Sequence, residues 1–212
     1  MKTILTLVRH GETKWNALGK FQGCKDIILS EEGVLQANYL KIRFENKYDY
    51  IYTSPLKRAI QTAEIISENN KIKPIIELKL REINFGDWEG LTVKEIETTY
   101  PEKFIQWKTD ELNAPICGGD LSLKLASIRA TEAILKIVKK HQGKNIIIVA
   151  HGGIIKAGLI GMFNLKMTMY HKMVLGNTAI SKTAFDHSLN PTLITLNDTS
   201  HLPNSYNIKS YV

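Results

Sequence analysis

Cysteine is scarce in this chain of 212 residues, and its scarcity limits the class of protein. Only Cys24 and Cys117 occur, and they lie far apart in the sequence. They show neither the spacing of metal ligands nor a framework of disulfides. We therefore expect a protein of a reducing compartment, the cytoplasm.

Long apolar runs are also lacking. No stretch approaches the ~20 consecutive apolar residues that a transmembrane helix needs. The start of the chain, Met1-Lys2 followed by a short apolar run, superficially resembles a signal peptide. That run falls below the about 7 to 15 residues of a signal sequence, and it ends in Arg9-His10. These features predict neither a membrane span nor a secretion signal.

Concentrated positive charge is the third absence. The net charge is +7, from 28 basic and 21 acidic residues, and such an excess can serve nucleic acid, an acidic membrane surface or a small anionic substrate. The basic residues are scattered, and the longest basic run is a pair such as Lys139-Lys140. Without a basic arm or stripe, the sequence predicts no nucleic-acid or membrane partner and favours a small anion.

What the chain does contain is an alternation of strand and helix patterns. The composition, 43% hydrophobic and 23% charged, is ordinary for a globular protein, and without repeats or linkers we expect one domain over residues 1–212. Apolar runs bounded by turn residues predict strands at 3–8, 50–53, 74–78 and 145–150, with later candidates at 179–185 and 192–196. The helical patterns between them predict an α/β fold with a mostly parallel sheet covered on both faces.

Helix signals divide the rest of the chain. Ser54-Pro55 predicts a helix start with serine as the cap, and Thr92 with Glu95 forms a capping box. An amphipathic pattern over residues 123–138 predicts a long helix that Gly143 ends. Residues 80–120 carry two tryptophans and no convincing strand, so we expect an excursion that covers a pocket.

Two of the predicted strands end in the same pair of residues, His-Gly. Arg9-His10-Gly11 follows the first strand, and His151-Gly152-Gly153 follows the strand at 145–150. Because the carboxyl ends of parallel strands meet at one edge of a sheet, we expect His10 and His151 to be neighbours. The helix that follows Gly153 directs backbone N–H groups toward the same place.

Cations converge on this edge as well. Arg9 adjoins His10, and Arg58 lies in the first turn of the helix that Ser54-Pro55 opens. Two guanidiniums and two imidazoles balance the charge of a phosphoryl group without a metal or cofactor. One imidazole must be unprotonated at its attacking nitrogen to act as a nucleophile.

The leaving alcohol of a phosphate ester needs a proton, so the site requires an acid. Glu82, just past the apolar run at 74–78, is our candidate. Asp87 and Glu89 lie close by and remain alternatives.

At this point the chain resembles the histidine phosphatase superfamily, also called the phosphoglycerate mutase-like family. Five motifs carry the resemblance, in the family's order: LVRHGETKWN at 7–16, FQG at 21–23, TSPLKRAIQTA at 53–63, LREINFGDWEG at 80–90 and VAHGG at 149–153. They span about the first three-quarters of the chain. The resemblance implies a three-layer αβα sandwich and a covalent phosphohistidine at His10.

The resemblance also implies roles for further residues. Arg9, Arg58 and His151 match the phosphate pocket, and Glu82 matches the proton donor, which would later activate the attacking water. The supporting residues that it implies are Asn16, Gln22, Gly23, Gly152 with its backbone N–H, and Asn177 in the Gly176-Asn177-Thr178 turn. No cofactor and no metal is implied.

Some residues depart from the family's pattern. Where many relatives read Gly-Gly-Glu-Ser, this chain has Gly118-Gly119-Asp120-Leu121, with Ser122 one place later. Ile28 stands where a proline is frequent, with Ser30 as the helix cap. Residues 91–120 lack the longer, basic insertion of phosphoglycerate mutases. The first two departures concern the pocket wall, whereas the absent insertion and the short length favour a phosphatase over a mutase.

Our leading hypothesis is a metal-independent phosphomonoesterase that acts on a small phosphorylated metabolite. FGDWEG at 85–90 and the small size are similar to α-ribazole phosphatases and equally to broad-specificity bacterial phosphatases, and the sequence leaves that choice open. The alternatives are a cofactor-dependent phosphoglycerate mutase and, from another class, a non-catalytic phosphate-binding regulatory module. The family also leaves monomer and homodimer open.

Several residues are expected to have ordinary structural roles. Trp88 and Trp107 are predicted to lie in the core, and Cys24 to act as a small buried hydrophobe. The remaining histidines are predicted to be surface or loop residues: His141, His171, His187 and His201.

Overall fold

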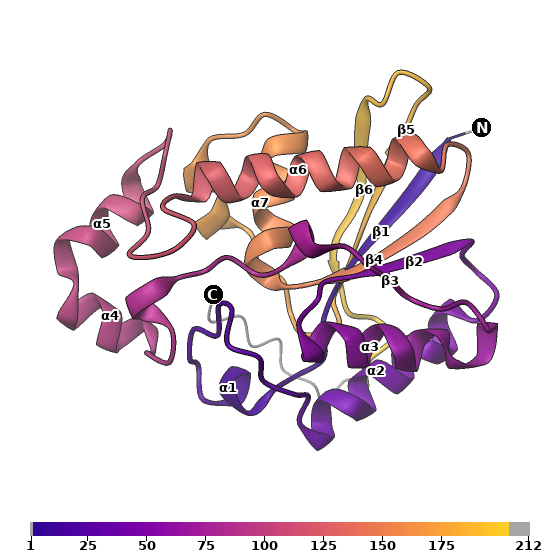
Figure 1. Ribbon diagram of the computed structural model, residues 1–212, viewed down its shortest axis with the longest axis horizontal. Helices are drawn as coiled ribbons and strands as arrows, with labels where there is room; N and C mark the ends of the chain where they lie inside the picture. The colour runs from indigo at the N-terminus through magenta and orange to yellow at the C-terminus, as the bar shows by residue number, and fades with distance from the viewer. Residues whose placement is uncertain (1, 204–212) are drawn as a thin grey trace.

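The computed structural model describes residues 2–203, which build a six-stranded sheet in the order β3-β2-β4-β1-β5-β6 (Figure 1). The strands are β1 (Thr3–Arg9), β2 (Tyr50–Thr53), β3 (Ile75–Ile76), β4 (Asn145–Ala150), β5 (Ile180–Phe185) and β6 (Pro191–Asp198). The strands β1 to β4 run parallel to one another, whereas β5 and β6 join antiparallel at the β1 side. The predicted parallel sheet is confirmed, with an antiparallel extension.

Helices cover both faces of this sheet. In Figure 1, α6 (Leu123–Lys140) and α7 (Gly152–Met162) lie on one side, and α2 (Glu31–Phe44) and α3 (Lys57–Ser67) on the other. The alternation of side chains along β4 matches these layers, because Ile146 and Ile148 pack into the core under α6 and α7, while Ile147 and Val149 pack toward α2 and α3. The predicted three-layer αβα sandwich is confirmed.

The excursion over residues 80–120 contains helices and turns but none of the sheet's strands. Its helices α4 (Val93–Thr99) and α5 (Pro101–Thr109) lie at one end of the molecule, away from the sheet (Figure 1). The capping box of Thr92 and Glu95 opens α4 as predicted. Trp88 and Trp107 are buried and meet ring to ring, with centroids 5.3 Å apart, so the prediction of core positions is confirmed.

The remaining elements are short. They are α1 (Lys14–Ala17) and the 3-10 helices η1 (Glu68–Asn70), η2 (Leu78–Leu80), η3 (Gly86–Trp88) and η4 (Met167–Lys172). The 3-10 helix η2 explains why the strand predicted at 74–78 is only Ile75–Ile76, since the chain turns from residue 78.

One cap prediction is wrong. Helix α3 begins at Lys57 with Leu56 as its N-cap, whose side chain forms no capping hydrogen bond, and Asp26 Oδ1 accepts the Lys57 N–H at 2.7 Å. Ser54 is instead fully buried two positions earlier, at the end of β2. Ser30, by contrast, caps α2 as predicted, and its hydroxyl accepts the Gly33 N–H.

No helix within residues 2–203 combines the length and apolar character that crossing a membrane requires. Met1 and residues 204–212 lie outside the described part of the chain. The single domain over 1–212 stays a prediction.

Candidate active site

The register of two strands places the two histidines together. In the parallel pair of β1 and β4, Arg9 stands opposite Ala150, so the next residues, His10 and His151, emerge side by side at the same sheet edge. The His10 N–H donates to the Ala150 carbonyl at 2.9 Å, and the two imidazole centroids lie 5.1 Å apart. The predicted adjacency of the histidines is confirmed.

The imidazole of His10 is held in one tautomer. Its Nδ1 lies 2.6 Å from the Gly11 carbonyl, which can only accept, so Nδ1 carries the proton and Nε2 keeps its lone pair. That Nε2 accepts from Arg58 Nε at 3.2 Å. Burial, followed by the charges of Arg58 and Arg9, holds the pKa of His10 well below its usual value. His10 is therefore neutral, with the unprotonated nitrogen that a nucleophile needs.

His151 is held in the opposite tautomer. Arg58 Nε donates to its Nδ1 at 3.1 Å, so the proton sits on Nε2, which donates to Ser54 Oγ at 2.6 Å. Burial, and then the charge of Arg58, holds the pKa of His151 well below its usual value. The sequence did not indicate that Ser54 is a partner of His151, because the Ser-Pro pair matched a helix cap.

Two buried guanidiniums supply the positive charge. Arg58 is 1% exposed, and its Nη1 and Nη2 donate to the carbonyls of Lys25 at 2.7 Å and Gly23 at 2.8 Å. Burial lowers its pKa to about 10, so it stays charged at neutral pH. Arg9 donates from Nη1 to the Leu175 carbonyl, and its Nε has no partner within residues 2–203. An anion would satisfy that unpaired donor.

Glu82 lies against the N-terminus of α7. Its Oε1 accepts the N–H groups of Ile83 and Ile154, both at 2.8 Å, and its Oε2 accepts that of Gly153 at 3.0 Å. Two of the N–H groups that we expected to face the phosphate therefore bind the carboxylate. Gly152, the first residue of α7, lines the pocket itself, and a Cβ there would approach Arg9 Nε to 3.4 Å.

The two alternative carboxylates lie elsewhere. Asp87 is exposed in η3. Glu89 accepts the Cys24 N–H at 2.8 Å and the Phe85 N–H at 3.3 Å, and a Cβ on Gly23 would collide with its Oε1 at 1.9 Å. Gly23 also has a φ of +50°, so glycine suits the loop on both counts. Among the three carboxylates, Glu82 lines the pocket that contains His10.

Most of the predicted site residues line one small pocket. Its walls are Arg9, His10, Asn16, Lys20, Gln22, Gly23, Arg58, Glu82, Phe85, Gly152 and Gly153. Gln22 is 7% exposed, and its Oε1 has no partner in the described part of the chain. Asn177 lies behind the nucleophile, where its Nδ2 donates to the His10 carbonyl at 3.1 Å and to Asn16 Oδ1 at 3.2 Å. The residues come together as expected, and their roles in the reaction stay predictions.

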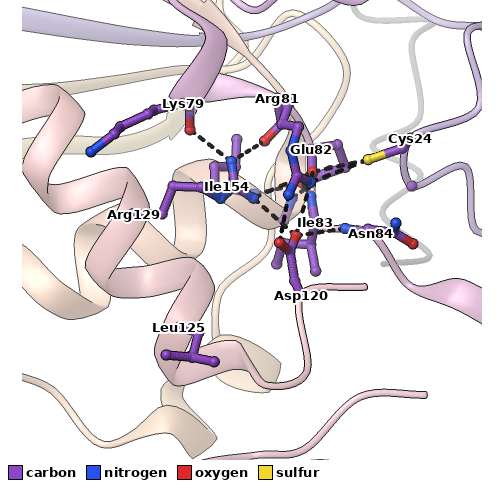
Figure 2. A network of polar contacts seen from close by, with 12 residues as sticks. Cys24, Lys79, Arg81, Glu82, Ile83, Asn84, Asp120, Leu125, Arg129 and Ile154 are labelled. Atoms are coloured by element: carbon purple, nitrogen blue, oxygen red, sulfur yellow. Dashed lines mark hydrogen bonds and ion pairs between the residues drawn. The ribbon is translucent and has the colours of Figure 1, made fainter. Parts of the chain in front are cut away.

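Figure 2 shows a polar network behind Glu82 that the sequence did not reveal. Arg81 and Arg129 both pair with Asp120, at 2.7 Å and 3.0 Å. Asp120 occupies the place where the sequence departs from the family's glutamate. The departure thus keeps a carboxylate at this point, and Ser122 caps α6 by accepting the Leu125 N–H.

Predictions for the other histidines were correct only in part. His187 is exposed. His141 is only 8% exposed, because the end of α6 packs on β2: the ring stacks on Tyr50 at 3.7 Å, and Nε2 lies 2.9 Å from the Tyr52 hydroxyl. The surface prediction is therefore wrong for His141. His201 is half-buried, with Nε2 3.1 Å from Thr178 Oγ1.

The remaining two predictions for individual side chains also need correction. His171 is half-buried, with Nε2 3.2 Å from the Trp107 carbonyl and the two rings 4.4 Å apart. Cys24 is half-buried rather than a core hydrophobe, because Arg81 Nη1 donates to its Sγ at 3.3 Å. Burial raises the pKa of the Cys24 thiol.

Comparison with known proteins places this geometry in a family. A model described as Histidine phosphatase superfamily (branch 1) matches residues 5–199. Phosphoserine phosphatase 1 of Hydrogenobacter thermophilus is 32% identical over 205 residues, which cover 95% of each chain. A solved structure of a phosphoserine phosphatase mutant from Entamoeba histolytica, in complex with phosphoserine, is 37% identical with a TM-score of 0.89, covering 95% of this chain and 100% of that one. A structure from Escherichia coli proposed to be an α-ribazole-5′-P phosphatase is 25% identical, with a TM-score of 0.80 over 93% of this chain and 97% of that one.

Proposed function

The chain belongs to the histidine phosphatase superfamily, and we propose that it hydrolyses small phosphomonoesters by way of a phosphoryl group carried on His10. That it is a phosphatase follows from the family and its phosphoserine phosphatase relatives. One observation carries the role of His10: its neutral imidazole presents an unprotonated Nε2 in a pocket with two buried guanidiniums.

In the first step, His10 Nε2 attacks phosphorus in line with the ester oxygen. The N–P bond forms as the P–O bond to the alcohol breaks, and Glu82 gives its proton to the departing oxygen. Arg9 and Arg58 neutralise the charge that spreads over the phosphoryl oxygens. Arg58 Nε, which hydrogen-bonds both imidazoles here, turns to the phosphoryl group when the substrate enters.

In the second step, water replaces the alcohol. Glu82, now ionised, takes a proton from the water as its oxygen attacks phosphorus, and the N–P bond breaks to release inorganic phosphate. His10 returns to its neutral form. The cycle uses protein side chains alone, so we expect activity to survive EDTA.

For the alcohol, we propose a small molecule that carries a carboxylate, with L-serine as the first candidate. The Hydrogenobacter relative is named for phosphoserine, and structures of the Entamoeba enzyme hold phosphoserine or 3-phosphoglyceric acid. Lys20 lines the pocket and offers an ammonium group for such a carboxylate. α-Ribazole phosphate is the second candidate, supported by the FGDWEG motif and the Escherichia coli structure.

A substrate panel tests this proposal. The kcat/KM values for L-phosphoserine, 3-phosphoglycerate, α-ribazole phosphate and fructose 6-phosphate are compared, each with and without EDTA. We expect the best carboxylate-bearing substrate to exceed the others by at least about tenfold, because a paired charge is worth more than 1 kcal/mol in a desolvated site. Preference for α-ribazole phosphate would support the second candidate instead.

The mutase alternative differs in the fate of the phosphohistidine. A mutase must keep the phosphoryl group until a second alcohol accepts it, whereas a phosphatase gives it to water. A chase of labelled phosphoenzyme with 3-phosphoglycerate separates the two. We expect prompt release of inorganic phosphate, and transfer to the chase compound without that release would favour the mutase.

Other properties of the protein stay predictions as well. We propose a small-molecule phosphate ester as the partner, without nucleic acid or membrane, and a monomer or homodimer. The free thiols of Cys24 and Cys117 support the cytoplasm as the location.

A further inference from the structure

The carboxylate of Asp120 collects four hydrogen bonds behind the proposed acid. Its Oδ1 accepts from Arg81 Nη2 at 2.7 Å, and its Oδ2 accepts from Arg81 Nη1 at 3.1 Å and from Arg129 Nη2 at 3.0 Å. The fourth donor is the Asn84 N–H, at 2.7 Å from Oδ2. The Asp120 side chain is 9% exposed, so these bonds lie largely out of water.

The two guanidiniums also bind the main chain at Glu82 and just before it. Arg129 Nη1 donates to the carbonyls of Lys79 at 2.7 Å and Arg81 at 2.8 Å. The Glu82 carbonyl accepts from Arg81 Nη1 at 3.1 Å and from Arg129 Nη2 at 3.4 Å. Figure 2 shows these contacts converging on the segment that carries Glu82. Asp120 thus connects helix α6, the end of the excursion and the acid's own backbone.

This cluster differs from the ion pairs on the surface. The Lys79–Glu132 pair has side chains 55% and 59% exposed, and such pairs contribute little because water screens them. The two arginines around Asp120 share one counter-charge in a half-buried place, with bidentate geometry from Arg81. Removing that carboxylate would leave both guanidiniums without a partner of opposite charge among residues 2–203.

We propose that Asp120 is a positioning residue of the reaction, which holds Arg81 and Arg129 against the backbone of Glu82. The proposal rests on the role of Glu82 as the acid given above. The carboxyl group must meet the departing oxygen within hydrogen-bond distance, and α7 contacts it from the front through the Gly153 and Ile154 N–H groups. Asp120 fixes the same segment from behind.

Several charged and titratable groups surround the carboxylate of Glu82. The groups that interact with its carboxylate from the packed elements are Arg9, Arg58, Arg129, Lys156, Tyr170 and Cys24. Burial opposes ionisation of Asp120, but the hydrogen bonds from Arg81 and the Asn84 N–H prevail, so its pKa lies below the usual value. Without this negative charge, the guanidiniums of Arg81 and Arg129 would lie uncompensated beside the segment that carries Glu82.

The test is Asp120→Asn, a change that keeps size and removes charge. Single-turnover rates of His10 phosphorylation are measured by rapid quench with L-phosphoserine, and with p-nitrophenyl phosphate, whose leaving group departs without a proton. We expect the alkyl ester to react roughly 10- to 100-fold more slowly, as misplaced catalytic groups do, and the aryl ester to change by less than about threefold. Asp120→Glu, which restores the carboxylate, should recover part of the alkyl-ester rate.

The matched control is Glu132→Gln, which removes an exposed carboxylate from the same helix as Arg129 and should leave both rates unchanged. The ratio of the two rates within one preparation does not depend on the folded fraction. Equal loss with both esters, or no loss with either, would overturn the role of Asp120. Wild-type protein that turns over neither ester would instead refute the proposed function itself.

Discussion

The nucleophile end and the acid end of the pocket are built by different means. His10 and His151 are placed by the register of β1 and β4, so the backbone of the sheet alone brings them together. Glu82 lies on an irregular segment after η2. This segment is held by N–H groups of α7 and by the side chains of Arg129 in α6 and of Asp120 in the turn before α6. One pocket thus combines residues that are positioned by strand pairing with an acid that is positioned by contacts between residues far apart in the sequence.

The two ends also serve different parts of the reaction. Every substrate must pass its phosphoryl group to His10, whatever the alcohol. The acid matters in proportion to how poorly the alcohol leaves, because a stable leaving anion needs no proton. Substitutions at the two ends should therefore give different patterns over a pair of alkyl and aryl esters.

The largest effect is expected at the nucleophile. His10→Ala should lower kcat on L-phosphoserine and on p-nitrophenyl phosphate alike, by at least about 10⁴-fold, because removing a nucleophile leaves only binding and electrostatics. Steady-state kinetics with both esters checks this. A variant that retained activity on p-nitrophenyl phosphate would show that the phosphoryl group is transferred without His10.

The acid end should be sensitive to the leaving group. Glu82→Gln keeps the shape of the side chain but has no acid proton, so we expect a loss of about 10²- to 10³-fold with L-phosphoserine. The rate of His10 phosphorylation by p-nitrophenyl phosphate, measured by rapid quench within one turnover, should fall by less than about tenfold, because this step needs no acid proton. Asp87→Asn, on the exposed carboxylate nearby, is the control and should match the wild type. If Asp87→Asn showed the larger loss, the acid would be misassigned.

Stability should depend on pH through His10 and His151 at the nucleophile end, and the lowered pKa values of His141, His171 and His201 add to the same loss. The pKa values of His10 and His151 are held well below 6.5 in the folded protein. Below pH 6.5 the unfolded chain therefore binds more protons than the folded protein, and the free energy of unfolding decreases as the pH is lowered. Each histidine contributes up to about 1.4 kcal/mol per pH unit until its folded pKa is reached. Urea unfolding between pH 7 and 5 measures this loss.

Asp120 at the acid end should affect stability in a lower pH range than the two histidines. Asp120 has a pKa below its usual value of 3.8, so its contribution to stability persists until the pH falls to that region. The control is His187→Asn at an exposed position, which should keep the wild-type pH dependence. A free energy of unfolding that stayed constant from pH 7 to 5 would contradict the neutral, buried state of the two histidines.

The smallest effect concerns the partner of His151. Ser54→Ala removes the hydroxyl 2.6 Å from Nε2, and one hydrogen bond of about 1 kcal/mol corresponds to roughly a fivefold loss of kcat/KM. The loss should be equal for the two esters, because Ser54 belongs to the nucleophile end. Ser54→Thr, which restores a hydroxyl, should recover activity. A loss confined to L-phosphoserine would connect Ser54 to the acid instead.

The nucleophile end was predictable from the sequence for a physical reason. Apolar runs identify the strands, and parallel pairing then brings Arg9, His10 and His151 to one edge without any knowledge of side-chain packing. Arg58 was also predictable, because the helix that carries it starts directly after the neighbouring strand. The residue types and the rule that parallel strands end at one sheet edge were sufficient to predict the nucleophile end.

The acid end was predictable only in its identity. Glu82 followed from chemistry and motif, but Arg81, Asp120 and Arg129 meet through contacts across up to 48 positions that no local pattern records. Ser54 was misread for the same reason, because its partner lies 97 positions away. His141 also became buried through tertiary packing, against a stacked tyrosine.

The most direct test of the proposed phosphohistidine mechanism is to locate the transferred phosphoryl group. Wild-type protein is mixed with L-phosphoserine, quenched within one turnover under alkaline conditions that preserve phosphohistidine, and digested for mass spectrometry. The proposed mechanism predicts a single added phosphoryl group on the peptide that contains His10, absent from His10→Ala and accumulated in Glu82→Gln when p-nitrophenyl phosphate is the donor. A phosphoryl group on another residue, or turnover with no phosphoenzyme at any time, would contradict it.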